Sequence, residues 1–286
     1  MSEFFLELFS EEVPALLQKN SRKSLLNAFQ KLFEEKEITY KKSASYSTPN
    51  RLIIIFEGLN KEIIKKAEII KGPNINAPEQ ALEGFLRSNQ ITKDQIFKNK
   101  NEKGEFYFFK TPSKKINTQD LLEEHIPELL GKIQWKKSMR WGNRELDWAR
   151  PLKPILASFD NKNLNFKFHH LTSSNMTFID KEFEEKKKIF KNFKTYKNFF
   201  LKSKVIIDHN QRRKIIEKEF IKISKRKNII IESNDKLLEE VVNLTDKPNI
   251  LICKFEERFL EIPEEILIIT MQHHQKYFPT FNSKGN

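Results

Sequence analysis

The stretch FFLELFSEEVPALL, residues 4–17, determines how the fold begins. Its first six residues alternate with a period of two, which is typical of a β-strand. Ser10, the two glutamates after it and Pro14 suit a helix start, because a capping side chain, acidic residues and proline all favour a helix N-terminus. Apolar residues then recur at helical spacing to Phe33, so we predict an amphipathic helix over residues 14–35.

Strands and helices alternate loosely along the rest of the chain. Short apolar runs predict strands: RLIIIFEGL from Arg51, EFYFFKT from Glu105, PILASFD from Pro154, NFKFHHL from Asn165, KVIID from Lys204, NILICKF from Asn249 and KYFPTF from Lys276. Helical spacing predicts helices from Pro78, over 117–133, 211–227 and 237–245, and from Pro263, while KGPN at 71–74 suits a turn. Regular βαβ spacing is absent, so the predicted class is α+β (mixed α/β), with mixed sheets and packed helices.

Residues 178–204 are nearly all lysine, glutamate and phenylalanine. We expect a charged helix here, with Phe183, Phe190, Phe193 and Phe200 as core contacts rather than base-stacking groups, since phenylalanine is usually buried. This helix is the predicted boundary between an N-terminal mixed α/β lobe, residues 1–177, and a second α/β lobe, residues 178–286.

The chain has 286 residues, a formal net charge of +13 and a pI of about 9.5. This charge suits a polyanionic partner, although lysines spread over every face would equally suit a solvated surface. Cys253 lies in the apolar run NILICKF and is predicted to be a core residue. We expect a soluble cytoplasmic protein, because no long apolar run or basic signal region occurs. The final turn NSKGN follows a strand without a second one, which suggests the front portion of a longer chain.

The sequence lacks the common signatures of catalysis. Neither GxGxxG nor GxxxxGK[ST] occurs, which argues against a phosphate-binding loop of either type. HExxH, CxxC and GxSxG are also missing, and adjacent histidines do not face one site. We therefore predict no catalytic residue, no metal and no cofactor in this segment.

Several stretches together resemble the β subunit of the bacterial heterotetrameric glycyl-tRNA synthetase. They are FFLELFSEEVPALL, STPNRLIIIFEGL with KGPN, ALEGFLRSNQIT, KSMRWG with DWARPLKPILA, and the long block from LLEEVVNLTDKPN to HHQKYFP. They cover most of the chain, and the last block, with FEERFLEIPEEIL and HQKYFP, is the most specific. The sequence departs from the family pattern at FIDKEF and at TDKPN, which puts a role of the first loop in tRNA contact in doubt.

The resemblance implies the N-terminal portion of a non-catalytic subunit. In that family the α subunit activates glycine with ATP and Mg, while the β subunit binds tRNA(Gly) and assembles with α as two α and two β chains. The fold is expected to resemble the editing-like module of the phenylalanyl-tRNA synthetase β subunit. No hydrolytic residue transfers from that similarity, so no editing is predicted.

The segment WKKSMRWGNRELDWARP, residues 135–151, holds every tryptophan of the chain and three of its few arginines. One interpretation is architecture, with Trp135 and Trp148 clamping the crossover onto the core and with Arg140 and Arg150 pairing with buried acids or carbonyls. The other is a surface for tRNA or the α subunit, because guanidinium groups bind phosphates and carboxylates well. The candidate binding residues are Arg51, Arg140, Trp141, Arg144, Arg150, Lys276 and Tyr277.

Some alternatives stay open for these residues and for the whole chain. Tyr277, with Phe278, is also consistent with sealing a strand into the core, which is the favoured interpretation, and Arg51 is consistent with capping backbone carbonyls. The chain itself is also compatible with a stand-alone RNA-binding module or with a scaffold domain that contacts only the α subunit.

Overall fold

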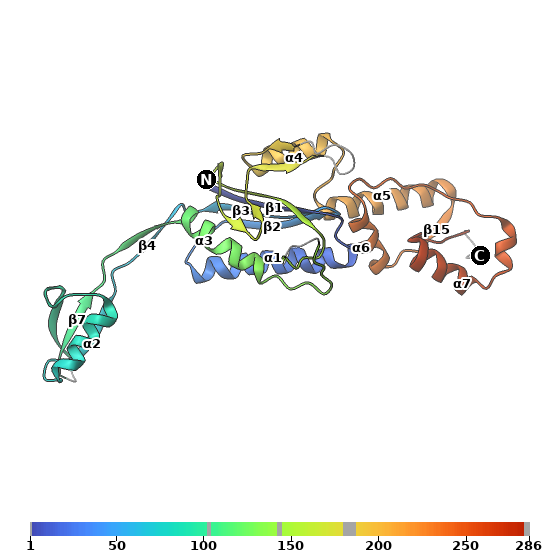
Figure 1. Cartoon of the computed structure of the whole chain (residues 1–286). Helices are drawn as coiled ribbons and strands as arrows, with labels where there is room; N and C mark the ends of the chain where they lie inside the picture. Colours follow the sequence, from blue (N-terminus) through green and yellow to red (C-terminus); the bar gives the residue numbers. More distant parts are fainter. Residues whose placement is uncertain (1, 102–103, 142–144, 180–186, 283–286) are drawn as a thin grey trace. The chain divides into compact units, whose positions relative to one another are not determined.

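The computed structural model describes residues 2–101, 104–141, 145–179 and 187–282, and the chain divides into two compact units (Figure 1). The main unit comprises Met1–Asn60 and Leu122–Asn286, and the small unit comprises Lys61–Leu121. Helices and antiparallel strands occur in both, so the predicted α+β class is confirmed.

The main unit is built on a five-stranded antiparallel sheet. In order across the sheet, its strands are β10 (Lys162–Asn163), β9 (Leu152–Phe159), β1 (Ser2–Ser10), β3 (Arg51–Leu59) and β2 (Lys42–Thr48). The central strand β1 pairs with β3 and β9, so that Phe4 lies between Phe56 and Phe159. The predicted first strand is confirmed. It continues through Ser10, however, so Ser10 does not cap the following helix.

Both faces of this sheet are covered, which explains why β1 is apolar on both sides. Helix α1 (Ala15–Glu35) packs on one face, where the ring of Phe29 lies 5.2 Å from that of Phe4. Helix α4 (Phe193–Lys202) packs on the other, where the ring of Tyr196 lies 4.8 Å from that of Phe5. Figure 1 shows these two helices on opposite sides of β1, β2 and β3.

The segment predicted as one charged helix is broken. Strand β13 (Met176–Phe178) pairs with β14 (Lys187–Ile189), and α4 begins only after Asn192, whose side chain accepts a hydrogen bond from the Thr195 backbone at 3.0 Å. An asparagine cap is a stronger local signal than a lysine-rich composition, so the long-helix prediction was wrong.

The core contacts predicted in that segment are confirmed where the structure describes them. Phe190, Phe193 and Phe200 are buried together with Phe5 of β1, while Phe183 lies outside the described residues. Because this cluster joins residues after 178 to the sheet strands β1, β3 and β9, the compact units differ from the predicted lobes 1–177 and 178–286.

The remaining elements of the main unit surround the sheet or follow it. They are α3 (Thr118–Gly131, which starts in the small unit), β11 (Lys167–Phe168), β12 (Leu171–Thr172), α5 (His209–Lys227), β15 (Ile229–Ile231), α6 (Asp235–Leu244), η2 (Glu257–Glu261), α7 (Glu264–Ile269), η3 (Thr270–Gln275) and β16 (Thr280–Asn282). Ile216 of α5 packs with Leu238 and Val242 of α6 in a second apolar cluster. The predicted helices 117–133, 211–227, 237–245 and the one from Pro263 are therefore confirmed.

Four predicted strands in the main unit were wrong in whole or in part. Of KYFPTF, only Thr280 and Phe281 belong to a strand, β16. NILICKF has no regular structure, and Cys253 is exposed rather than buried, because no described strand pairs with this run. KVIID is also irregular, although Ile206 and Ile207 are buried. NFKFHHL is divided by a turn at His169, whose φ of 51° separates β11 from β12.

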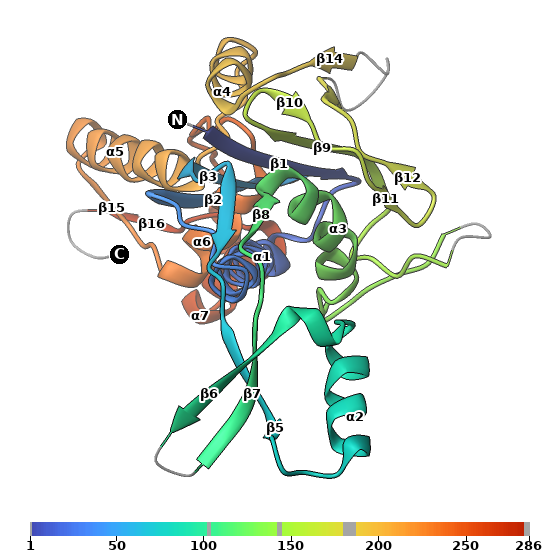
Figure 2. The same ribbon diagram turned by 90° about the vertical axis from the view of Figure 1, so that its left-hand side faces the viewer.

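The small unit contains a two-stranded and a three-stranded antiparallel sheet, with one helix packed beside the three-stranded sheet (Figure 2). Its elements are β4 (Glu62–Lys65), β5 (Ile69–Asn74), α2 (Glu79–Asn89), η1 (Lys93–Gln95), β6 (Ile96–Asn101), β7 (Gly104–Lys110) and β8 (Lys114–Asn117). Strand β4 pairs with β8, and β5 and β6 flank β7. The predicted turn KGPN instead belongs to β5, where the pairing is irregular between Lys71 and Asn74.

Candidate nucleic-acid interface

Arg51, one of the predicted binding residues, lies inside the core of the main unit. Its side chain is 1% exposed, and its Nε lies 2.8 Å from Oε1 of Glu7, which is fully buried. One Nη donates to the carbonyl of Phe178 at 2.7 Å. The guanidinium therefore caps a carbonyl and neutralises a core carboxylate. It cannot reach a phosphate in this fold, which corrects the prediction of a binding role.

Aromatic groups complete the surroundings of this ion pair. The guanidinium carbon of Arg51 lies 4.7 Å from the ring centre of Phe9 and 4.5 Å from that of Phe200. The hydroxyl of Tyr196 donates to Oε1 of Glu7 at 2.6 Å. Burial raises the pKa of Glu7 above its ordinary value, and the positive charge of Arg51 opposes this. The cluster fastens α4 to the sheet.

The tryptophan segment is partly architecture. Trp148 is 2% exposed, and its ring packs edge-on against those of Trp135 at 4.9 Å and Phe168 at 5.8 Å. Trp148 and Met139 also form an isolated antiparallel β-bridge, in which the backbone N–H of each residue donates to the carbonyl of the other. The predicted clamp formed by Trp135 and Trp148 is therefore confirmed.

The other candidates in this segment have different environments. Arg140 is exposed, and Trp141 beside it is half-buried, with its ring 6.2 Å from that of His170. Arg150 is half-buried and donates to the carbonyl of Ala149 at 2.8 Å. Arg144 lies outside the described residues. Among the described candidates of this segment, Arg140 is thus the exposed cation, and the ring of Trp141 beside it is partly accessible.

Lys276 and Tyr277 follow the end of η3. Lys276 has a φ of 58°, and its ammonium lies 3.0 Å from a carboxylate oxygen of Glu240. Tyr277 is 52% exposed, whereas Phe278 packs edge-on against Phe220 at 4.8 Å. Sealing into the core therefore applies to Phe278 and not to Tyr277, which stays an accessible candidate.

A buried arginine that the sequence did not single out links α5 to α6 and β2. Arg212, in the first turn of α5, donates to the carbonyls of Val242 and Ser47, each at 2.9 Å, and burial lowers its pKa to about 10. Arg212 stands at helical spacing with Ile216 and Phe220, on the apolar face of α5. That spacing was the signal that could have identified it as a core residue.

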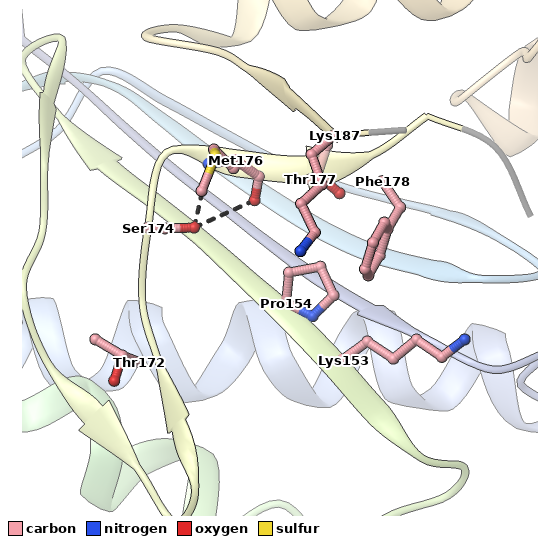
Figure 3. A pocket seen from close by; sticks show the side chains of 8 residues that line it. All are labelled: Lys153, Pro154, Thr172, Ser174, Met176, Thr177, Phe178 and Lys187. Atoms are coloured by element: carbon pink, nitrogen blue, oxygen red, sulfur yellow. Dashed lines mark hydrogen bonds between the residues drawn. The ribbon is translucent and has the colours of Figure 1, made fainter. Parts of the chain in front are cut away.

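A surface pocket of about 480 Å³ lies beside β9 and β13 (Figure 3). Its lining residues are Lys153, Pro154, Thr172, Ser174, Met176, Thr177, Phe178 and Lys187. The ammonium of Lys187 lies 5.3 Å from the ring centre of Phe178, and that of Lys153 lies 2.6 Å from Glu11. Among the described residues, the lining offers ammonium groups and hydroxyls but no carboxylate or imidazole. It therefore suits an anionic group better than acid–base chemistry.

The described residues contain no grouping of three or more histidine, cysteine, aspartate or glutamate side chains that could hold a metal ion. Within the same ranges, no helix has both the length and the apolar character needed to cross a membrane.

Comparison with known sequences identifies the family. The family model described as "Glycyl-tRNA synthetase beta subunit" matches residues 4–286. The chain belongs to the glycyl-tRNA synthetase beta subunit family. It is 38% identical, over its whole length, to the glycine–tRNA ligase beta subunits of Rickettsia conorii and Rickettsia prowazekii, and 36% identical to that of Rickettsia akari. It spans 43% of the length of each of these relatives. The predicted resemblance is thus confirmed.

Proposed function

We propose that the chain is the N-terminal portion of the beta subunit of glycyl-tRNA synthetase. In this role it supports ATP-dependent attachment of glycine to tRNA(Gly) by binding the tRNA and assembling with a catalytic alpha subunit. The observation that carries the proposal is the family match over residues 4–286. The net charge of +13 agrees with a polyanionic substrate.

Binding and catalysis are separated in this proposal. The alpha subunit supplies the ATP and Mg sites, while this segment supplies no cofactor site and no bond-making group. The expected assembly is two alpha and two beta chains in the cytoplasm. Among the described candidates, Arg140 and Trp141 suit contact with tRNA best, because an exposed guanidinium binds phosphate and an aromatic ring stacks on an unpaired base.

The first test separates binding from chemistry. Purified 286-residue chain is incubated with glycine, ATP and Mg, and pyrophosphate exchange is measured with and without the alpha subunit. We expect no exchange from this chain alone. Glycine activation by the chain in the absence of alpha would overturn the proposal.

The second test addresses tRNA contact. Binding of tRNA(Gly) to wild-type chain and to Arg140→Ala is followed over a salt series, with Arg226→Ala as a control that removes one exposed arginine elsewhere, in the last turn of α5. Arg140→Ala should lower the slope of log K against log salt by about 0.7–0.9 for one lost phosphate contact. A flat slope for the wild-type chain would favour a scaffold that contacts only the alpha subunit.

A further inference from the structure

The sheet of the small unit has one face covered by α2 and one open face. On the covered side, Phe109 is 9% exposed, and a Cβ on Gly72 would lie only 2.9 Å from the ring of Phe85 in α2. Figure 2 shows α2 alongside β5 and β7. Side chains alternate between the faces of a strand, so the neighbours of Phe109 and Gly72 project from the other side.

The strand register places Asn99 of β6, opposite Phe106, on the open face together with the six side chains that give this face its charge and its aromatic character. These six are Ile69 and Lys71 of β5, Phe97 of β6, and Phe106, Phe108 and Lys110 of β7. Lys71, Phe108 and Phe97 form one row across the three strands, because Phe108 pairs with each of the other two.

Aromatic rings and ammonium groups are interleaved on this open face. The rings of Phe97 and Phe108 are stacked, 5.9 Å apart at an angle of 24°, and Phe97 is 40% exposed. The ammonium of Lys71 lies 3.5 Å from the ring centre of Phe106. Ile69 is 62% exposed, and Lys110 is exposed. The solvated face of an antiparallel sheet is normally polar, so one exposed phenylalanine, Phe97, beside the half-buried Phe106 and Phe108 points to a ligand.

The charge of the open face selects the class of ligand. Its described side chains include no carboxylate, while Glu105 of β7 alternates to the side covered by α2, with Lys98 and Lys100. Lysines beside exposed rings match a polymer that carries phosphates and flat bases in alternation. Unpaired bases stack on exposed aromatic side chains of a sheet, whereas bases inside a duplex are not accessible to them.

We infer that the open face of the small unit binds unpaired nucleotides of an RNA. The bases stack on Phe97, Phe108 and Phe106, and the phosphates lie against Lys71 and Lys110. The inference rests on the proposed function only for naming tRNA as that RNA, since the chemistry of the face selects a single-stranded segment by itself.

The test measures fluorescence anisotropy of a labelled ten-nucleotide oligouridylate with the whole 286-residue chain over a salt series. Phe97→Leu/Phe108→Leu keeps apolar bulk but removes the stacking surface, and we expect binding to weaken about 10-fold or more. Lys71→Gln/Lys110→Gln keeps the rings and should lower the salt slope by about 1.4. The matched control, Lys98→Gln/Lys100→Gln, removes the same charge from the covered side and should leave the slope closer to that of the wild-type chain.

Several results would overturn the inference. The first is that none of the variants changes the affinity for oligouridylate. The second is that the control and Lys71→Gln/Lys110→Gln lower the salt slope equally. The third is that the chain binds a duplex RNA of the same length more tightly than oligouridylate. A fourth is that the open-face variants bind oligouridylate normally but fail to assemble with the alpha subunit, which would assign the face to a protein. The lysine variants keep the test valid if the leucine variants do not fold.

Parallel binding of tRNA(Gly) to the same proteins separates this inference from the proposed function. If wild-type chain and open-face variants bind tRNA equally well, only the inference about the small unit fails. If wild-type chain binds oligouridylate through the open face but does not bind tRNA(Gly), the tRNA-binding part of the proposed function fails instead.

Discussion

The five-stranded sheet of the main unit and the three-stranded sheet of the small unit are both antiparallel and rich in phenylalanine, yet each places a cation against rings in a different setting. Arg51 lies between Phe9 and Phe200 with 1% of its side chain exposed. Lys71 lies over Phe106 on a surface. The same pairing is structural where helices cover both faces of a sheet, and is available to a ligand where only one face is covered.

This difference also explains why an arginine in the sequence does not by itself indicate an exposed cation. Arg51, Arg22 and Arg212 are all almost fully buried, and each is bonded to groups within the chain. A planar guanidinium with five donors can satisfy several carbonyls at once, so it is the cation best suited to a core. Lysine, with a single solvated charge, stays at the surface beside the exposed rings of the small unit.

The largest expected effect comes from removing the buried cation. Arg51→Ala leaves Glu7 ionised or protonated without its partner, and we expect a loss of about 3–5 kcal/mol in the free energy of unfolding. Urea denaturation followed by tryptophan fluorescence measures this in the main unit, which holds every tryptophan. Glu7→Gln/Arg51→Met should recover much of the loss. An unchanged urea midpoint for Arg51→Ala would contradict the structural role of the pair.

The second effect is a pH dependence confined to the main unit. Burial lowers the pKa of His209 to about 4, and the positive charge of Arg22 acts in the same direction. Between pH 6.5 and about 4 the unfolded chain binds a proton that the folded chain does not, so stability falls as the pH falls. The loss should reach about 2–3 kcal/mol.

His209→Gln is the control for this pH dependence, because it removes the titrating ring and leaves other acids in place. The difference in unfolding free energy between wild type and variant should shrink on acidification. A constant difference between pH 7 and pH 4 would show that His209 titrates normally in the folded chain.

The third effect tests how closely α2 packs on the small sheet. Gly72→Ala places a Cβ 2.9 Å from the ring of Phe85, and such overpacking costs about 1–3 kcal/mol. Amide hydrogen exchange in β7 and α2 would report the loss. Gly84→Ala is the matched control in α2, since no atom lies within 4 Å of its added methyl, and it should stabilise the helix by up to about 1 kcal/mol. Equal exchange rates for both variants would argue against close packing.

The smallest effect belongs to the exposed cation. Lys71→Ala should change the stability of the small unit by only about 0.5–1 kcal/mol, the usual size of a solvated cation–π contact. The same exchange measurement applies, with Lys98→Ala as a comparison, because its ammonium lies 5.9 Å from the ring centre of Tyr107. A loss as large as that of Arg51→Ala would remove the contrast between the two sheets.

Local patterns predicted elements well where the chain supplies its own packing partners. The period of two in residues 4–9 and the helical spacing of residues 14–35 were sufficient, because β1 and α1 bury their apolar sides against each other. NILICKF has the same apolar character but lies exposed, with Leu251 74% accessible. A short apolar run indicates that a partner is needed and does not show which segment supplies it.

The candidate binding residues were predictable only in part. The tryptophan clamp and the accessible pair Arg140 and Trp141 came from one segment that composition singles out. The open face of the small unit could not be identified in this way, because Lys71, Phe97 and Phe108 are distant in the sequence and meet only through the register of three strands.

The sequence by itself determined the class of fold, the apolar first strand with its helix, and the family to which the chain belongs. Each of these follows from the spacing of apolar residues or from the order of residue types along the chain. Tertiary structure alone decided which charges are buried and which rings stay exposed, because burial depends on whether a second layer covers a face. That layer is formed here by residues remote in the chain, such as Tyr196 against Phe5.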